Sequence, residues 1–146
     1  MSLDSWAKNG WLRAHKPSKE EISNLLEIVE RDLKDASAKG LSDDWRFGIA
    51  YNAALKLCTI LLPSSGYRPE KNLAHYRTLQ SLSLILGTQH SSNTDYLDVC
   101  RKKRNETEYD IAGTVTKEEA DELIGFCLEL KDEVFSWLKK HHKGLI

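Results

Sequence analysis

The chain has 146 residues, in which 21 lysines and arginines face 22 aspartates and glutamates, giving a formal net charge of −1 and a sequence pI of about 6.5. This length suits one ordinary domain with a hydrophobic core of its own. The even balance of charge excludes a protein that holds nucleic acid mainly through its overall field, and leaves open only a local basic patch.

Two parts are expected along the chain: an N-terminal arm, residues 1–17, in which Trp6 and Trp11 pack locally, and a helical domain, residues 18–146. No repeat or low-complexity tract divides the second part. Runs of alternating apolar and polar residues with hairpin turns are missing, so strands are not predicted. The pattern predicts an all-α fold, an antiparallel bundle of about five helices.

The first two helices are marked by their ends. Ser18 and Glu21 fit a capping box, and the apolar residues that follow recur with helical spacing until Gly40. A second helix is expected to begin at Ser42 and to stop before Pro63, because proline removes a hydrogen bond from a helix interior.

The second helix is apolar on almost every side, and we assign Trp45 to its buried surface. Only Asn52, Lys56 and Thr59, spaced by four and three residues, form a polar strip along it. A helix with this pattern belongs in the middle of a bundle. Trp45 and the other aromatic residues of the helices are therefore interpreted mainly as core packing.

A third helix is predicted over residues 72–86, with His75 at the surface and Gly87 at its end. The polar residues 88–94 are interpreted as a link to a fourth helix over residues 95–111. The glycine that follows that helix marks a break before the last one.

The last helix is the longest. Thr116 and Glu119 form a second capping box, and the apolar residues from Ala120 to Trp137 alternate spacings of three and four. This spacing is typical of a seam against an antiparallel neighbour.

The cysteines and the N-terminus indicate the compartment. Cys58, Cys100 and Cys127 cannot all pair within one chain, and each lies among apolar residues, so we expect buried, reduced thiols and no bound metal. The first residues lack the charged lead and apolar run of a signal peptide, and Lys56 interrupts the longest apolar stretch. A cytoplasmic protein with no membrane role and no cofactor is expected.

One charged run lies where a buried stripe should be. Residues 101–104 read Arg-Lys-Lys-Arg and spread around most of a helix, and Leu97 and Ile111 mark an apolar stripe that contains Arg104. A buried arginine needs a partner. That partner is either Glu108, four residues further on, or a phosphate in a cleft, and the spacing does not decide between them.

Three neighbours of Arg104 form a second column on the same helix. Arg101, Asn105 and Tyr109 follow one another at intervals of four residues. Arg104 and Tyr109 are five residues apart and point about 140° away from each other. One flat surface could not use both side chains, whereas a deep cleft, a helix end or a second subunit could.

The hexapeptide Arg104-Asn-Glu-Thr-Glu-Tyr109 resembles the R-N-x-x-x-H motif of HEPN domains, a family of helical nucleotide-binding and ribonuclease domains, with tyrosine where histidine usually stands. The likeness covers most of residues 18–142. The features that accompany it are a five-helix layout, Tyr51-x-x-Ala54, the Gly66-Tyr67-Arg68 loop, His75 beyond that loop, and a long final helix that opens with Thr116-x-x-Glu119.

The resemblance implies a homodimer whose two motifs line a shared cleft. Active members of the family are metal-independent ribonucleases, often toxins paired with a small nucleotidyltransferase as antitoxin. Carried over, Arg104 would hold the phosphate with Arg101 beside it, Asn105 would order the site, and Tyr109 would occupy the acid–base position.

The tyrosine alters the expected activity. Free tyrosine has a pKa near 10, so only about one phenol in a thousand is ionised at pH 7, whereas histidine is a competent base there. We therefore expect a non-catalytic or very slow module that binds nucleotide or RNA phosphate near Arg104. There are two alternatives. One is an active ribonuclease with Tyr109 as the proton-transfer group, and the other is a plain helical scaffold in which Arg104 is paired with Glu108.

Overall fold

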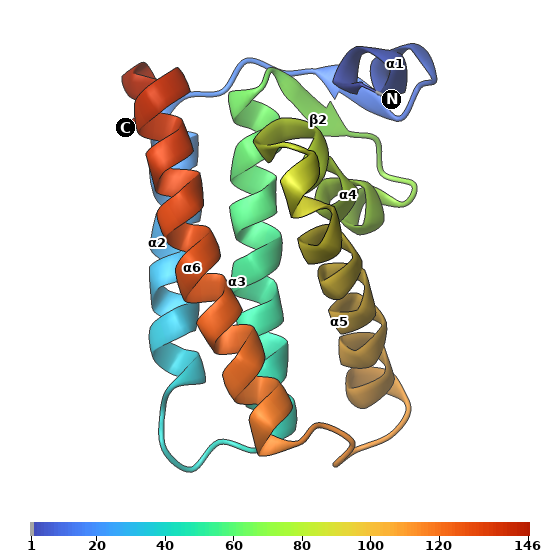
Figure 1. Cartoon of the computed structure of the whole chain (residues 1–146), viewed down its shortest axis with the longest axis vertical. Coiled ribbons are helices and arrows are strands. Elements are labelled where there is room, and N and C mark those ends of the chain that lie inside the picture. Colours follow the sequence, from blue (N-terminus) through green and yellow to red (C-terminus); the bar gives the residue numbers. More distant parts are fainter. Residues whose placement is uncertain (1) are drawn as a thin grey trace.

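The computed structural model describes residues 2–146 and has, within that range, six α-helices and one small sheet. The all-α fold is confirmed, and its bundle has five helices (Figure 1): α2 (Lys19–Ala36), α3 (Asp43–Ser64), α4 (Ala74–Leu86), α5 (Ser91–Tyr109) and α6 (Lys117–His141). Helix α1 (Leu3–Lys8) and strands β1 (Leu12–Ala14) and β2 (Tyr67–Pro69) lie together at one end. Short 3₁₀ turns cover Thr88–His90 and Lys143–Leu145.

Helix α3 occupies the centre of the bundle, as predicted from its apolar composition. It contacts α2, α4, α5 and α6. By length and hydropathy α3 could cross a membrane, but 72% of its most apolar window is buried inside the bundle, as in the core helix of a soluble domain. Asn52, Lys56 and Thr59 remain partly exposed, so the predicted polar strip is present.

The helices do not all alternate in direction. In Figure 1, α2 and α5 run antiparallel to α3, whereas α6 runs parallel to α3. Two contacts agree with the parallel direction. Arg46 bonds Asp121, and further along both helices Cys127 Sγ donates to the Ala50 carbonyl at 3.2 Å. We expected an antiparallel neighbour for α6; its broadest contact is instead with the parallel helix α3.

Most helix ends follow the sequence signals. The Ser18 and Ser42 hydroxyls accept backbone N–H groups three residues on, and Thr116 and Glu119 form the expected capping box. The box predicted at Ser18 is only half present. The Glu21 carboxylate bonds His15 at 2.8 Å instead of returning to the cap.

Several predicted boundaries are wrong; α2 ends at Ala36 and not near Gly40, and α5 ends at Tyr109 and not at residue 111. Helix α3 continues through Pro63 to Ser64, because a proline in the last turn costs one hydrogen bond while Leu62 beside it stays fully buried. Helix α5 begins at Ser91, four residues early, where the polar link was expected. Thr94 is buried there, with its hydroxyl bonded to the His90 carbonyl at 3.3 Å, so local bonds satisfy this polar segment.

The sheet contradicts the prediction of no strands. Strands β1 and β2 pair antiparallel, with Leu12 opposite Pro69 and Ala14 opposite Tyr67. Three residues are too short a run to show alternation in a sequence. Apart from Met1, which lies outside the described residues, the N-terminal arm packs on the end of α3 through a small cluster of Trp6, Leu12 and Leu62.

The three cysteines are free and buried, as expected. Burial raises the pKa of the Cys58 thiol to about 12, and burial also raises the pKa of Cys100, to about 11. Both thiols therefore stay protonated at neutral pH and serve as small packing groups.

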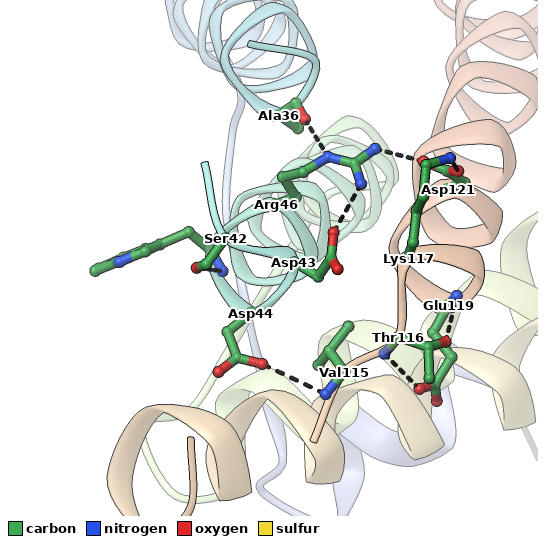
Figure 2. A network of polar contacts seen from close by, with 11 residues as sticks. Ala36, Ser42, Asp43, Asp44, Arg46, Val115, Thr116, Lys117, Glu119 and Asp121 are labelled. Atoms are coloured by element: carbon green, nitrogen blue, oxygen red, sulfur yellow. Dashed lines mark hydrogen bonds and ion pairs between the residues drawn. The ribbon is translucent and has the colours of Figure 1, made fainter. Parts of the chain in front are cut away.

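An arginine joins three helices at the end where α3 and α6 begin (Figure 2). Arg46 donates from Nε to the Ala36 carbonyl at the end of α2 (3.2 Å), from Nη1 to Asp43 (3.1 Å) and from Nη2 to Asp121 on α6. Its side chain is only 16% exposed. Nearby, Asp44 accepts the backbone N–H of Gly113 at 2.6 Å and so holds the α5–α6 loop against α3.

We expect Arg46→Met to lower the free energy of unfolding by about 1–3 kcal/mol, because it leaves the Ala36 carbonyl and the Asp43 carboxylate without their donor and removes one of the two donors to Asp121. Urea unfolding followed by circular dichroism measures the change. Lys117→Met is the matched control, since Lys117 bonds the same Asp121 at 2.7 Å but is 71% exposed. Equal stability of the Arg46 variant and the control would contradict the role given to Arg46.

Candidate functional site

A groove follows the polar strip of α3. The name groove is used here for two separate cavities beside that strip, and among the described residues no α6 side chain lines either of them. The first, which we call the α3–α5 pocket, has a volume of about 670 Å³ and includes Asn52. The second, the α2–α4 pocket, has a volume of about 720 Å³ and includes Thr59. Lys56 lies on the strip between Asn52 and Thr59.

Arg104 forms part of the wall of the α3–α5 pocket. Its Nε lies 2.8 Å from Glu108 Oε2, its Nη1 donates to Asn105 Oδ1 at 3.3 Å, and its guanidinium carbon lies 5.7 Å from the ring centroid of Tyr51. The Glu108 partner expected of a scaffold is therefore present, but the pair borders a cavity. Both side chains are partly exposed, and such an i,i+4 pair contributes only about 0.3–0.5 kcal/mol.

Tyr51 lies beneath this arginine with an unusual hydroxyl. The residue is 2% exposed, and its hydroxyl has no hydrogen-bond partner within residues 2–146. Burial raises the pKa of Tyr51 to about 12, while the charges of Arg101 and Arg104 act in the opposite direction. A buried hydroxyl without a partner is costly, and beside two guanidinium groups it is suited to donate to an anion.

His75 lies near several cationic side chains. The side chain is exposed, as predicted, and it lines the α2–α4 pocket together with Arg68. Partial burial lowers the pKa of His75, and the charges of Lys56, Arg104 and Arg101 lower it further. The imidazole is therefore neutral at neutral pH, and the positive groups of α3 and α5 act on it together.

The other predicted site residues do not all lie in one place. Arg101 bonds Asp98 at 3.0 Å, and its guanidinium carbon lies 5.6 Å from the ring centroid of Tyr76. Tyr109 is 72% exposed at the end of α5 and lines neither cavity. The structure thus brings Arg101 and Arg104 near Tyr51 and leaves Tyr109 apart. Ile111, expected in the apolar stripe, is 53% exposed because α5 ends before it.

Sequence reasoning missed the residues opposite Arg104. Trp45, assigned to the core, is 66% exposed and lines the α3–α5 pocket with Gly48 and Asp32. The assignment failed because Trp45 lies in the first turn of α3, where the bundle no longer covers every side. Gly48 lies three residues after Trp45, inside a helix that does not require a glycine. This glycine is the sequence feature that could have indicated the pocket.

Comparisons with known proteins add no relative: no protein-family model, no curated protein and no solved structure matches the chain. The groove itself is therefore the feature from which the function of this chain is inferred. Its central feature is Arg104, which lines the α3–α5 pocket and lies over the ring of the buried Tyr51, with the charge of Arg101 also acting on that tyrosine.

Tyr51→Phe should raise the free energy of unfolding by about 1 kcal/mol in buffer without phosphate, because it removes an unpartnered buried hydroxyl. Added inorganic phosphate should then stabilise the wild type more than the variant. Urea unfolding with and without phosphate measures both effects. A variant less stable than the wild type in phosphate-free buffer would show that the hydroxyl has a partner within the protein.

Proposed function

We propose that this chain is a HEPN-type module that binds the phosphate of a nucleotide or an RNA at Arg104. The observation that carries the proposal is the position of Arg104 at a cavity wall and over the ring of Tyr51, whose buried hydroxyl has no partner among residues 2–146. A guanidinium and a hydroxyl donor beside further cations form a site for a phosphate group. The R-N-x-x-x-Y motif and the helical bundle agree with that family.

Binding is favoured over catalysis by the place of Tyr109. The motif position that should move a proton lies at the exposed end of α5, outside both cavities. Within one chain its phenol is therefore not part of the groove that holds Arg104. A module that binds RNA or nucleotide and cleaves slowly or not at all follows from this separation.

The proposal extends to a cytoplasmic homodimer that works with a nucleotidyltransferase partner. The dimer is supported by exposed apolar residues at the end of the bundle where α5 stops, namely Tyr109 and Ile111. A second copy packed there would cover them and carry its own Tyr109 towards the first groove. The nucleotidyltransferase partner is supported by the family resemblance.

Arg104→Ala should weaken the binding of a labelled single-stranded RNA about ten-fold or more, because it removes the phosphate ligand. Fluorescence anisotropy at low and moderate salt measures the affinity. Lys139→Ala removes the same charge from α6, where Lys139 lies over Phe135, and should change the affinity less than about two-fold. A wild type that binds neither RNA nor nucleotides refutes the proposal, and sedimentation of the same samples tests the dimer.

A metal-independent ribonuclease is a second candidate, and His75 is the observation that favours it. Its neutral imidazole lies within the field of Arg101, Arg104 and Lys56, where a base could take the proton of an RNA 2′-hydroxyl. This assigns the base to α4 in place of Tyr109.

RNA incubated with the protein in EDTA should then be cleaved by the wild type and by Tyr109→Phe. Cleavage should fall at least about a hundred-fold in His75→Gln and in Arg104→Ala, because base and phosphate ligand are lost. Denaturing gels measure the rates. An inert wild type rejects the ribonuclease and leaves the binding module.

A further inference from the structure

The α3–α5 pocket has a composition that phosphate binding does not explain. Besides Arg104 it is lined by an exposed indole, an aliphatic wall and a polar floor, and it encloses about 670 Å³. Cavities that accept a small organic ligand have this volume and this mixture of apolar walls and few polar groups.

Trp45 and Gly48 form one wall. They lie three residues apart on α3 and so share a face of the helix. Trp45 is 66% exposed, a costly position for an indole unless it meets a ligand. A side-chain carbon added at Gly48 would meet nothing within 4 Å, so close packing does not require the glycine, which costs about 1 kcal/mol in a helix relative to alanine. Its effect is to leave space beside the indole.

The floor consists of hydrogen-bond acceptors. Asp32 is 5% exposed, and its Oδ2 accepts from Asn52 Nδ2 at 2.6 Å while its Oδ1 accepts from the Arg31 Nε at 3.0 Å. One of the two N–H groups of the Asn52 amide goes to Asp32, and no group among residues 2–146 donates to its Oδ1. Both Asp32 oxygens already act as acceptors and the Asn52 carbonyl oxygen is free to accept, so the floor favours a ligand that donates N–H groups.

The acidic groups on the rim are engaged elsewhere. Glu108 pairs with Arg104, and Asp44 accepts the backbone N–H groups of Gly113 and Val115. Because these carboxylates are engaged, a ligand in the pocket would contact the indole of Trp45, the space beside Gly48 and the buried acceptors. Arg104 lies at one side of this space.

We propose that the α3–α5 pocket binds a nucleobase that carries an exocyclic amino group, stacked on Trp45 with its amine directed to Asp32 and Asn52. This deepens the proposed function and rests on it, since the phosphate of the same nucleotide lies at Arg104. The pocket therefore selects among nucleotides, favouring adenine, cytosine or guanine over uracil and hypoxanthine.

Matched nucleotides test the selection. AMP and IMP differ at position six of the purine, where an amine is replaced by a carbonyl, and CMP and UMP differ in the same way at position four. The amino-bearing member of each pair should bind about ten-fold more tightly by isothermal titration calorimetry. Asp32→Asn should reduce that preference, because an amide presents a donor as well as an acceptor. Equal affinities within both pairs overturn the proposal.

A variant that fills the pocket provides the control for folding. Gly48→Leu should abolish AMP binding while leaving the protein at least as stable, because leucine is a better helix former and its first carbon meets open space. Gly125→Leu makes the same change in the middle of α6, where an added carbon also meets nothing, and should bind AMP as the wild type does. AMP binding that survives in Gly48→Leu places the nucleotide elsewhere and overturns the proposal.

Nucleosides separate this inference from the proposed function. Adenosine and inosine lack the phosphate, so a preference for adenosine that depends on Gly48 supports the pocket even if RNA binding at Arg104 fails. RNA binding that depends on Arg104, with no discrimination between AMP and IMP or between CMP and UMP, refutes the base pocket and leaves the phosphate site.

Discussion

The structure depends on the burial of one helix. Helix α3 contacts four other helices and contributes more buried residues to the core than any other helix. Each neighbour covers a different part of its surface, so the few polar side chains that α3 carries must emerge along a single line. Asn52, Lys56 and Thr59 follow that line, and the two cavities lie along it. The groove is therefore a consequence of packing, and its chemistry is set by the residues at its edges.

The end of the bundle where α3 begins fixes the geometry of the α3–α5 pocket. Arg46 ties α3 to the end of α2 and the start of α6, and Asp44 holds the loop that follows α5 (Figure 2). These bonds restrain the helices on both sides of the pocket without using its floor. Asp32 and Arg104 come from those two helices, so their separation is determined by packing and caps far from either side chain.

The sequence was most informative where local chemistry decides the structure. Helix caps such as Ser42 and Thr116 were predicted because one side chain and the next turn suffice to define them. The pairing of β1 with β2, the parallel direction of α6 and the start of α5 depend on distant segments, and local patterns do not contain that information. For the site, the motif located Arg104, but Asp32 and Trp45 meet it only in the folded chain.

Local ion pairs also explain how a nearly neutral chain could carry the proposed anion site. Arg101 and Arg104 each have a carboxylate on their own helix, Asp98 and Glu108, so the protein remains balanced when nothing is bound. The Arg104 pair is partly exposed and weak, whereas a phosphate offers several acceptors in the geometry of a guanidinium. Exchange of Glu108 for phosphate would release an acidic side chain at the rim of the pocket. The affinity would then equal the difference in free energy between the Arg104–phosphate pair and the Arg104–Glu108 pair, which favours modest, salt-dependent binding. Selectivity between nucleotides would be set by the uncharged contacts of the base.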